Sequence, residues 1–261
     1  MRFIHITDTH VGPTPYYTLH GQPALLTLEA LVDRINHLPF KPDFVLHTGD
    51  VTDDYSESAY ALARAALSKL RYPIHYVVGN HDRPAPMLRG LLDKTPAGER
   101  YDYYVEIGGF GLAVFDTRGP VDPAGTLLPD QLAALRDLCH RDGPPLLIAI
   151  HHQPVKLDTT WLDEKWPNGL SMALDCGDAF RAALAPARDR IRGVFFGHVH
   201  RGFQVVQDGI LYCAAPSALF QFGSWPGATE PIPSWDEPPG YAVVTVTDSQ
   251  TLVRHCTFPR P

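Results

Sequence analysis

The sequence lacks several features that define common classes of protein. No uninterrupted apolar stretch approaches the roughly 20 residues that a transmembrane helix requires. The N-terminus enters a strand-like run at residues 2–6 without the apolar core of a signal peptide. We therefore expect a soluble, cytoplasmic protein that does not bind membranes.

Cysteine is scarce, and positive charge is in deficit. The 4 cysteines include no C-x-x-C pair, so neither a zinc knuckle nor a redox motif is predicted. The 22 lysine and arginine residues are outnumbered by 29 aspartate and glutamate residues, which gives a formal net charge of −7. This balance disfavours a protein that holds a nucleic-acid polymer by electrostatic attraction. Any phosphate chemistry here needs metal ions or a local arginine.

The chain has enough apolar residues to build a globular core. Its 261 residues are 44% hydrophobic, which favours one domain over a disordered chain. Short apolar runs predict strands at residues 3–6, 44–46, 74–78, 112–115, 146–150, 194–196, 210–214 and 241–246. Apolar residues at helical spacing predict helices at residues 24–38, 58–70, 129–139 and 178–184. This alternation favours a layered α/β or α+β domain with a more antiparallel C-terminal part.

Two stretches, residues 154–177 and 218–240, interrupt this alternation and are longer than ordinary connections. We interpret them as insertions in a single domain that spans residues 1–261. They hold all 4 tryptophans, namely Trp161, Trp166, Trp225 and Trp235. These rings suit either a cap that stacks on a nucleobase or an apolar surface for homo-oligomer formation. The second interpretation is preferred, because long aromatic insertions more often pack on protein than on ligand.

Polar residues that can bind metal follow the apolar runs directly. In chain order they form the motifs D-x-H, G-D, G-N-H-D, H-H and G-H-x-H, at residues 8–10, 49–50, 79–82, 151–152 and 197–200. In open α/β sheets, ligands gather beyond the carboxyl ends of the strands. We therefore expect one sheet to direct all of these motifs into a single crevice.

The residue types in these motifs suit a site for two divalent ions. Asp8 and His10, two positions apart, can reach one ion, and the two oxygens of Asp50 can bridge two ions. Asn80 offers a neutral carbonyl oxygen, and further histidines supply nitrogen. The predicted metal ligands are Asp8, His10, Asp50, Asn80, His151, His198 and His200.

The order of these motifs resembles the calcineurin-like metallophosphoesterase superfamily, over residues 1 to about 215. Within it the chain is most similar to bacterial class III cyclic-nucleotide phosphodiesterases and the related glycerophosphodiesterases, with further cues at residues 49–60, 151–154, 161–163, 215–217 and 221–222. The resemblance implies a four-layer αββα sandwich, here with a small cap formed by the insertions. It also implies that Asp8, His10, Asp50 and His200 hold one ion, and that Asp50, Asn80, His151 and His198 hold the other.

The chain departs from related families at informative positions. Purple acid phosphatases have a tyrosine where this chain has Asp53, and protein Ser/Thr phosphatases have a glutamate where it has Asp82. The usual H-H-P motif is H-H-Q-P here, which leaves the choice of ligand between His151 and His152 open. His151 is preferred because it follows the apolar run directly.

The resemblance implies hydrolysis of a small phosphodiester by a hydroxide that bridges the two ions. The expected substrate is a cyclic nucleotide, 3′,5′-cyclic AMP or a 2′,3′-cyclic nucleotide. The alternatives are a glycerophosphodiesterase, another phosphoesterase of the superfamily, or a non-catalytic scaffold with this fold. Mixed oxygen and nitrogen ligands suit manganese, iron, zinc or cobalt, and the habit of the family favours manganese or iron.

Side chains near the predicted ligands are candidates for contact with substrate. His81, which the adjoining Asp82 can orient, is the candidate for stabilising the transition state and protonating the leaving oxygen. The predicted catalytic residues are thus His81 and Asp82, and the predicted substrate contacts are Asn80, His81, His152 and Arg83.

Overall fold

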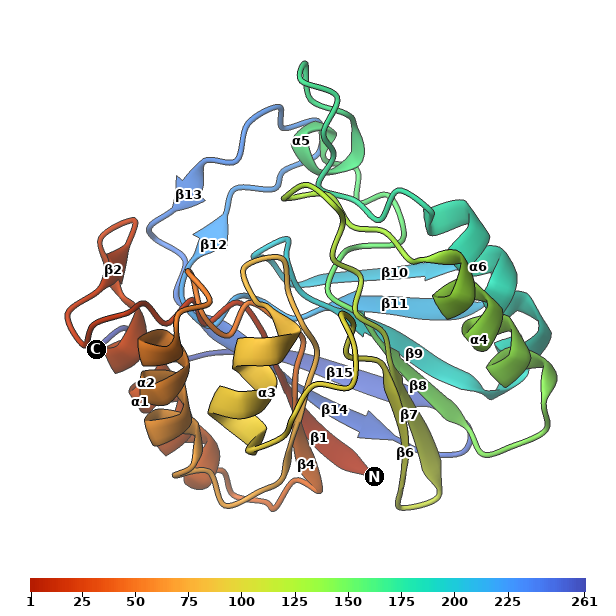
Figure 1. Ribbon diagram of the computed structural model, residues 1–261, viewed down its shortest axis with the longest axis horizontal. Helices are drawn as coiled ribbons and strands as arrows, with labels where there is room; N and C mark the ends of the chain where they lie inside the picture. Colours follow the sequence, from red (N-terminus) through yellow and green to blue (C-terminus); the bar gives the residue numbers. More distant parts are fainter.

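Two β-sheets lie face to face at the centre of the molecule, with helices on both outer sides (Figure 1). The computed structural model describes residues 1–261. The 5-stranded sheet has the order β15-β14-β1-β4-β5. Its strands are β1 Arg2–Ile6, β4 Phe44–His47, β5 Ile74–Tyr76, β14 Gly240–Val246 and β15 Thr251–Thr257.

The 6-stranded sheet has the order β10-β11-β9-β8-β7-β6. Its strands are β6 Tyr103–Ile107, β7 Phe110–Val114, β8 Leu146–Ala149, β9 Ile191–Phe196, β10 Phe203–Gln207 and β11 Ile210–Ala214. The central strands of both sheets run parallel, as in the pairs β1 with β4 and β8 with β9. They are buried on both faces, which explains why they are continuous apolar runs in the sequence.

Helices cover the outer face of each sheet (Figure 1). The apolar side chains of α1 Ala24–Asn36, α2 Glu57–Leu67 and α3 Pro84–Leu92 share one core with the 5-stranded sheet. Those of α4 Pro129–His140, α6 Gly177–Leu184 and the short 3₁₀ helix η1 Ala185–Arg190 share another core with the 6-stranded sheet. The predicted αββα arrangement is confirmed. None of the helices has the length and apolarity that crossing a membrane demands.

A third apolar core fills the space between the two sheets. Phe3 of β1 stacks on Phe44 of β4 with ring centroids 4.8 Å apart, and it meets Phe195 of β9 edge-on at 5.1 Å. All three rings are fully buried. Because each such ring is worth about 1.5–3 kcal/mol when it is removed from water, this layer fixes the position of one sheet against the other.

The two Trp-rich stretches lie beside one another above the sheets (Figure 1). The first contains α5 Thr160–Asp163, and the second contains the paired strands β12 Gln221–Phe222 and β13 Pro233–Ser234. The amide of Trp161 donates to the carbonyl of Ala228 at 3.0 Å, and that of Gly227 donates to Asp158 at 3.0 Å. These bonds join the two stretches. A small hairpin of β2 Thr18–Leu19 and β3 Gln22–Pro23 lies near the second. The interpretation as insertions in one domain stays a prediction.

Candidate metal centre

The predicted ligands meet at the carboxyl ends of strands from both sheets. The 5-stranded sheet supplies Asp8, His10, Asp50 and Asn80, and the 6-stranded sheet supplies His151, His198 and His200. The prediction that one sheet carries every motif is therefore wrong. The carboxyl ends of the central strands of the two stacked sheets meet at one end of the sandwich, so the crevice lies between the sheets.

The backbone at most of these residues is left-handed. The φ angles are 54° at Asp8, 44° at His10, 53° at Asp50, 69° at His198 and 47° at His200. Such values are uncommon for residues other than glycine, although aspartate and histidine tolerate them best. Residues held in this way cluster at functional sites. The chain thus turns sharply where each strand ends, at the residues that carry the metal-binding side chains.

Two glycines let the loops come close enough for these side chains to meet. A Cβ atom on Gly79 would lie 2.1 Å from Oδ1 of Asp50, and one on Gly49 would lie 2.5 Å from Nδ1 of His151. Gly49 also has a φ of 102°, which a side chain would strain. Glycine is therefore required at both positions of the G-D and G-N-H-D motifs.

One group of ligand atoms gathers around His10. Its Nε2 atom lies 3.0 Å from Nε2 of His200 and 3.7 Å from Oδ2 of Asp50. Nε2 of His200 is 3.7 Å from Oδ1 of Asp8. These are the residues that the family resemblance assigns to the first ion.

The other group gathers around His151. Its Nε2 atom lies 3.0 Å from Oδ1 of Asn80 and 3.3 Å from Oδ2 of Asp50. His198 stands nearby, with its ring centroid 5.0 Å from that of His151. Asp50 therefore contacts both groups, which is the position that a bridging carboxylate needs.

The protonation pattern of these histidines fits a cation. Nδ1 of His151 donates to the carbonyl of Thr48 at 2.7 Å, and Nδ1 of His200 donates to that of Phe220 at 3.2 Å. A hydrogen on Nδ1 leaves Nε2 of the neutral ring as a lone pair. These lone pairs point at another imidazole Nε2, an amide oxygen and carboxylate oxygens. Lone pairs that converge without a donor repel one another unless a cation binds them.

The electrostatics agree with this interpretation. Burial opposes protonation of His151, but the charges of Asp50 and Asp8 prevail and raise its pKa to about 9. Burial likewise opposes the charge of Asp50, yet His151 and His81 hold its pKa well below the usual value. Burial raises the pKa of Asp8 to about 6. The negative field that favours a second proton, on Nε2 of His151, also attracts a divalent ion in place of that proton.

Asp53 is a functional candidate that the sequence did not single out. Its Oδ1 atom accepts from Nδ1 of His10 at 3.0 Å, and its Oδ2 atom accepts from the hydroxyl of Tyr17. The carboxylate also lies 3.4 Å from Nδ1 of His81. A carboxylate behind a metal-binding imidazole fixes its orientation and raises its basicity. In the sequence, this position stood out only because purple acid phosphatases have a tyrosine there.

His81 lies at the mouth of the site, but Asp82 does not orient it. Nδ1 of His81 donates to the carbonyl of Asp53 at 2.9 Å. The buried carboxylate of Asp82 instead accepts from the amides of Val51 at 3.1 Å and Gly79 at 3.2 Å and from the hydroxyl of Tyr60 at 2.8 Å. The predicted role of Asp82 beside His81 is corrected, because the carboxylate oxygens of Asp82 accept hydrogen bonds from these other groups and not from His81.

Two predicted substrate contacts are also corrected. The guanidinium of Arg83 donates to the carbonyls of Asn80 and Asp82, both at 2.7 Å, and lies over the ring of Tyr55. His152 is fully buried, with its Nδ1 atom 2.8 Å from the hydroxyl of Thr117. Neither side chain lines the pocket beside the ligands. Both are used to support the loops.

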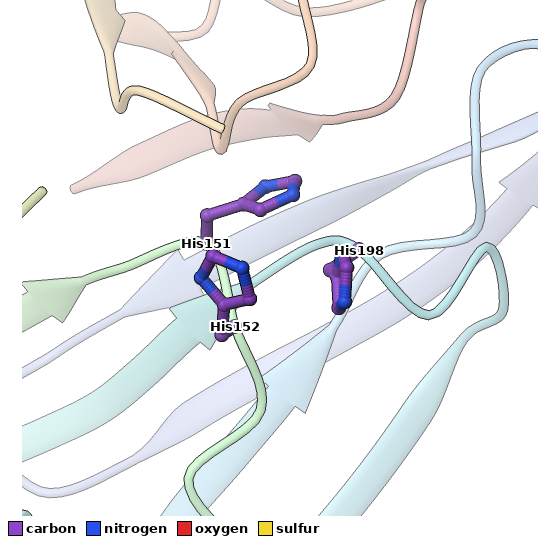
Figure 2. A group of neighbouring side chains, drawn as sticks. All are labelled: His151, His152 and His198. Atoms are coloured by element: carbon purple, nitrogen blue, oxygen red, sulfur yellow. The ribbon is translucent and has the colours of Figure 1, made fainter. Parts of the chain in front are cut away.

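His152 nevertheless belongs to a compact group of histidines. Figure 2 shows the rings of His151, His152 and His198 close together, and a ligand atom of each lies within 4.8 Å of those of the other two. The centroids of His152 and His198 are 4.6 Å apart, and Nε2 of each is buried without a hydrogen-bond partner. The chemistry of the donors permits either His151 or His152 as ligand. Geometry favours His151, because only its Nε2 atom contacts Asn80 and Asp50.

A pocket of about 250 Å³ opens beside the ligands. It is lined by His10, Asp50, Asn80, His198 and His200, by Asp53 and His81, and by aromatic and apolar residues. A larger hollow of about 590 Å³ between β6 and α4 contains none of the predicted ligands. The smaller pocket is thus the candidate site, since it alone combines space with metal-binding chemistry.

A family model of calcineurin-like phosphoesterases matches residues 1–202. The chain belongs to this family, and the predicted family is confirmed. It is similar to a protein named 3′,5′-cyclic adenosine monophosphate phosphodiesterase CpdA from Pseudomonas aeruginosa, with 29% identity over 87% of this chain and 79% of that protein. It is also similar to a probable glycerophosphodiester phosphodiesterase GpdQ from Arcobacter nitrofigilis, with 25% identity over 99% and 93% of the two chains.

The fold has known counterparts as well. A dimetal phosphatase from Danio rerio superposes with a TM-score of 0.64 and 14% identity, over 97% of this chain and 98% of the other. The fold class is thereby confirmed. The predicted class of enzyme, a phosphoric diester hydrolase, is also confirmed at the level of class by the family and by these relatives. The family further implies a centre of two divalent ions, for which the clustered aspartates and histidines are suited.

Proposed function

We propose that this protein hydrolyses a small cyclic nucleotide, 3′,5′-cyclic AMP or a 2′,3′-cyclic nucleotide, with two manganese or iron ions. The observation that carries the proposal is the convergence of imidazole lone pairs and carboxylates from both sheets on one small pocket. Its volume of about 250 Å³ lies just below the range of about 300–1,000 Å³ that is usual for small-molecule sites, which favours a small substrate. The net charge of −7 disfavours a polymeric nucleic acid.

The roles of the residues follow from their contacts. Asp8, His10, Asp50 and His200 would hold one ion, and Asp50, Asn80, His151 and His198 the other. When bound, the two ions supply Lewis-acid activation of the phosphate and lower the pKa of a water molecule for in-line attack. His81 is held through Nδ1 by the carbonyl of Asp53, so its other nitrogen is free to give a proton to the leaving oxygen. The carboxylate of Asp53 stabilises the positive charge that this role requires.

Glycerophosphodiesters are the second candidate substrates, because the similarity to the GpdQ protein spans nearly both chains. Self-association through the insertions is retained as a proposal for the second insertion alone. Its Trp225 and Trp235 are 65% and 46% exposed, whereas Trp161 is 2% exposed. A ring that is buried within its own chain is not free to bind another.

The test is hydrolysis by the manganese-loaded protein. Bis(p-nitrophenyl) phosphate and 3′,5′-cyclic AMP should be cleaved, and activity should vanish in chelator and return with metal. Asn80→Ala should lower kcat/KM by about 100-fold or more, as expected for loss of a ligand to an ion that stabilises the reacting phosphate. Asn36→Ala, at the far end of α1, is the matched control. Cleavage of monoesters alone would refute the diesterase, and a protein that takes up no metal would favour the scaffold.

A further inference from the structure

The half of the pocket that faces away from the metal ligands is apolar. Four segments build it: the hairpin of β2 and β3, the loop between β7 and α4, the first insertion and the second insertion. Its lining residues are Leu19, Pro123, Trp161, Trp166, Met172, Phe220, Phe222 and Pro231. Outside the metal ligands and their partners Asp53 and His81, His20 is the one lining residue with a polar side chain, and it is exposed at the rim.

The tryptophans in this half offer no hydrogen-bond donor to a ligand. Nε1 of Trp166 donates to the carbonyl of Trp161 at 3.0 Å. Nε1 of Trp161 is buried without a hydrogen-bond partner, and the whole residue is 2% exposed. Both indoles therefore present carbon surface alone. Apart from His20 at the rim, a group bound here meets rings and aliphatic side chains, which cannot recognise its polar edge.

The apolar half begins directly beside a predicted metal ligand. The ring centroid of Phe222 lies 5.2 Å from that of His200 and 5.4 Å from that of Trp161. Phe220 is still closer to His200, at 4.6 Å. The apolar surface therefore begins next to the ring of His200, beside the place where the metal ligands would hold the phosphate. The organic group attached to the phosphate must lie against that surface.

We propose, resting on the function proposed above, that this half of the pocket binds the planar base of the substrate by stacking and apolar contact alone. Adenine and guanine differ in the donors and acceptors on their edges, whereas both present a similar π-face. Sites that bind a polar edge discriminate by about 10⁴–10⁵-fold, whereas apolar pockets discriminate by about 10–200-fold. The enzyme should therefore hydrolyse the cyclic nucleotides of both purines with similar kcat/KM. It should prefer them to glycerol phosphodiesters, which carry no aromatic ring.

A quaternary ammonium group is the other ligand that aromatic surfaces bind. A carboxylate beside the rings would strengthen such binding, but no carboxylate lines the apolar half. The carboxylates of the pocket, Asp50 and Asp53, contact His151 and His10. The planar base is the better match, and a choline ester serves as a test of the alternative.

The first experiment compares kcat/KM of the manganese-loaded protein for 3′,5′-cyclic AMP, 3′,5′-cyclic GMP and glycerophosphocholine. The two purine nucleotides should differ by less than about tenfold, as expected of stacking without edge recognition, and both should exceed glycerophosphocholine. A preference of more than about 200-fold for one purine would overturn the inference. So would a preference for glycerophosphocholine, which would indicate an ammonium site.

Variants of two tryptophans test whether the preference between substrates arises in the pocket. Trp166→Leu should lower kcat/KM for both cyclic nucleotides by about 5–150-fold, the range of one lost stacking contact, and more than for glycerophosphocholine. Trp166→Phe should restore most of this loss. Trp225→Leu, which removes an exposed tryptophan outside the pocket, should leave the ratio between substrates unchanged. An equal loss on all substrates in Trp166→Leu would contradict the role of this residue.

Binding provides a readout that does not depend on turnover. Calorimetric titration should show that 5′-AMP and 5′-GMP bind with similar affinity, that glycerol 3-phosphate binds more weakly, and that Trp166→Leu removes the difference. If no diester is hydrolysed but this pattern holds, the proposed function fails and the apolar base site stands. If diesters are hydrolysed but the pattern is absent, the base site fails alone.

Discussion

Asp53 is the residue on which the contacts behind the metal ligands converge. We predict that Asp53→Asn weakens manganese binding by about 10–100-fold, because an amide orients His10 but does not raise its basicity as a carboxylate does. Manganese titration followed by calorimetry measures the effect. The matched control is Asp54→Asn, since Asp54 bonds only to Ser56 in the adjoining turn. Equal metal affinity in both variants would show that Asp53 has no such role.

His5 makes the stability of the metal-free protein depend on pH. Burial, reinforced by His255 and His47, lowers its pKa from 6.5 to about 3. Between these values the unfolded chain binds a proton that the folded protein does not. The contribution of a neutral His5 is therefore complete above pH 6.5 and is lost as the pH falls toward 3, by about 1.4 kcal/mol per pH unit.

We accordingly predict that His5→Gln flattens the acid side of the stability curve. Urea unfolding of chelator-treated protein at pH 7, 6 and 5 measures the slope. His37→Gln provides the control, because His37 lies on the surface beside Asp33. A slope that is the same in His5→Gln and in the unaltered protein would disprove the assignment.

The meeting of the candidate ligand residues at one site could be predicted from the sequence, whereas their supporting contacts could not. Ligands follow apolar runs directly, and the carboxyl ends of parallel strands must meet at one edge. The positions of Asp82 and Arg83 depend instead on how two loops fold against each other. Sequence adjacency suggested that Asp82 orients His81, but the loop turns its carboxylate toward the amides of Val51 and Gly79.

Asp82 joins the loop after β4, the loop after β5 and helix α2. We predict that Asp82→Asn lowers the free energy of unfolding by about 2–4 kcal/mol, since hydrogen bonds to a charged group contribute about 1.5–3 kcal/mol each. Tyr60→Phe removes one of these bonds and should cost less, about 1.5 kcal/mol. Urea unfolding compares the two. Unchanged stability with lost hydrolysis in Asp82→Asn would instead restore its predicted catalytic role.

Strands whose residues are buried on both faces were predictable, whereas three of the four edge strands were not. All apolar runs of the central strands are strands in the structure. The edge strands β6, β10 and β15 alternate partly buried with exposed residues and therefore lack a continuous apolar run. Helix α3 begins with Pro84 and Pro86, which conceal a helix from pattern analysis although proline is tolerated in the first turn.

The candidate metal centre takes its residues from both sheets of the molecule. Because each proposed ion takes ligands from both sheets, binding should stabilise the sandwich against global unfolding. At free manganese 100-fold above its Kd, we expect about 2.7 kcal/mol for each ion and a rise in Tm of about 2–4 °C per kcal/mol. Differential scanning calorimetry with and without manganese measures this rise.

Variants of one ligand from each sheet, Asn80→Ala and His200→Ala, should each reduce the rise. Asn36→Ala, which removes no predicted ligand, should retain all of it even if it lowers the Tm itself. An identical Tm with and without manganese would contradict a site shared between the sheets.

The pocket is built from two kinds of chain segment. Strand ends carry the predicted metal-binding side chains, whereas the hairpin, the two insertions and Pro123 of the β7–α4 loop form the apolar half. The residues that would cleave the phosphate and the residues that would select the substrate therefore lie in separate segments of the chain. Exchanging residues 154–177 and 218–240 between relatives should redirect the choice of alcohol while the phosphate-cleaving apparatus is inherited intact.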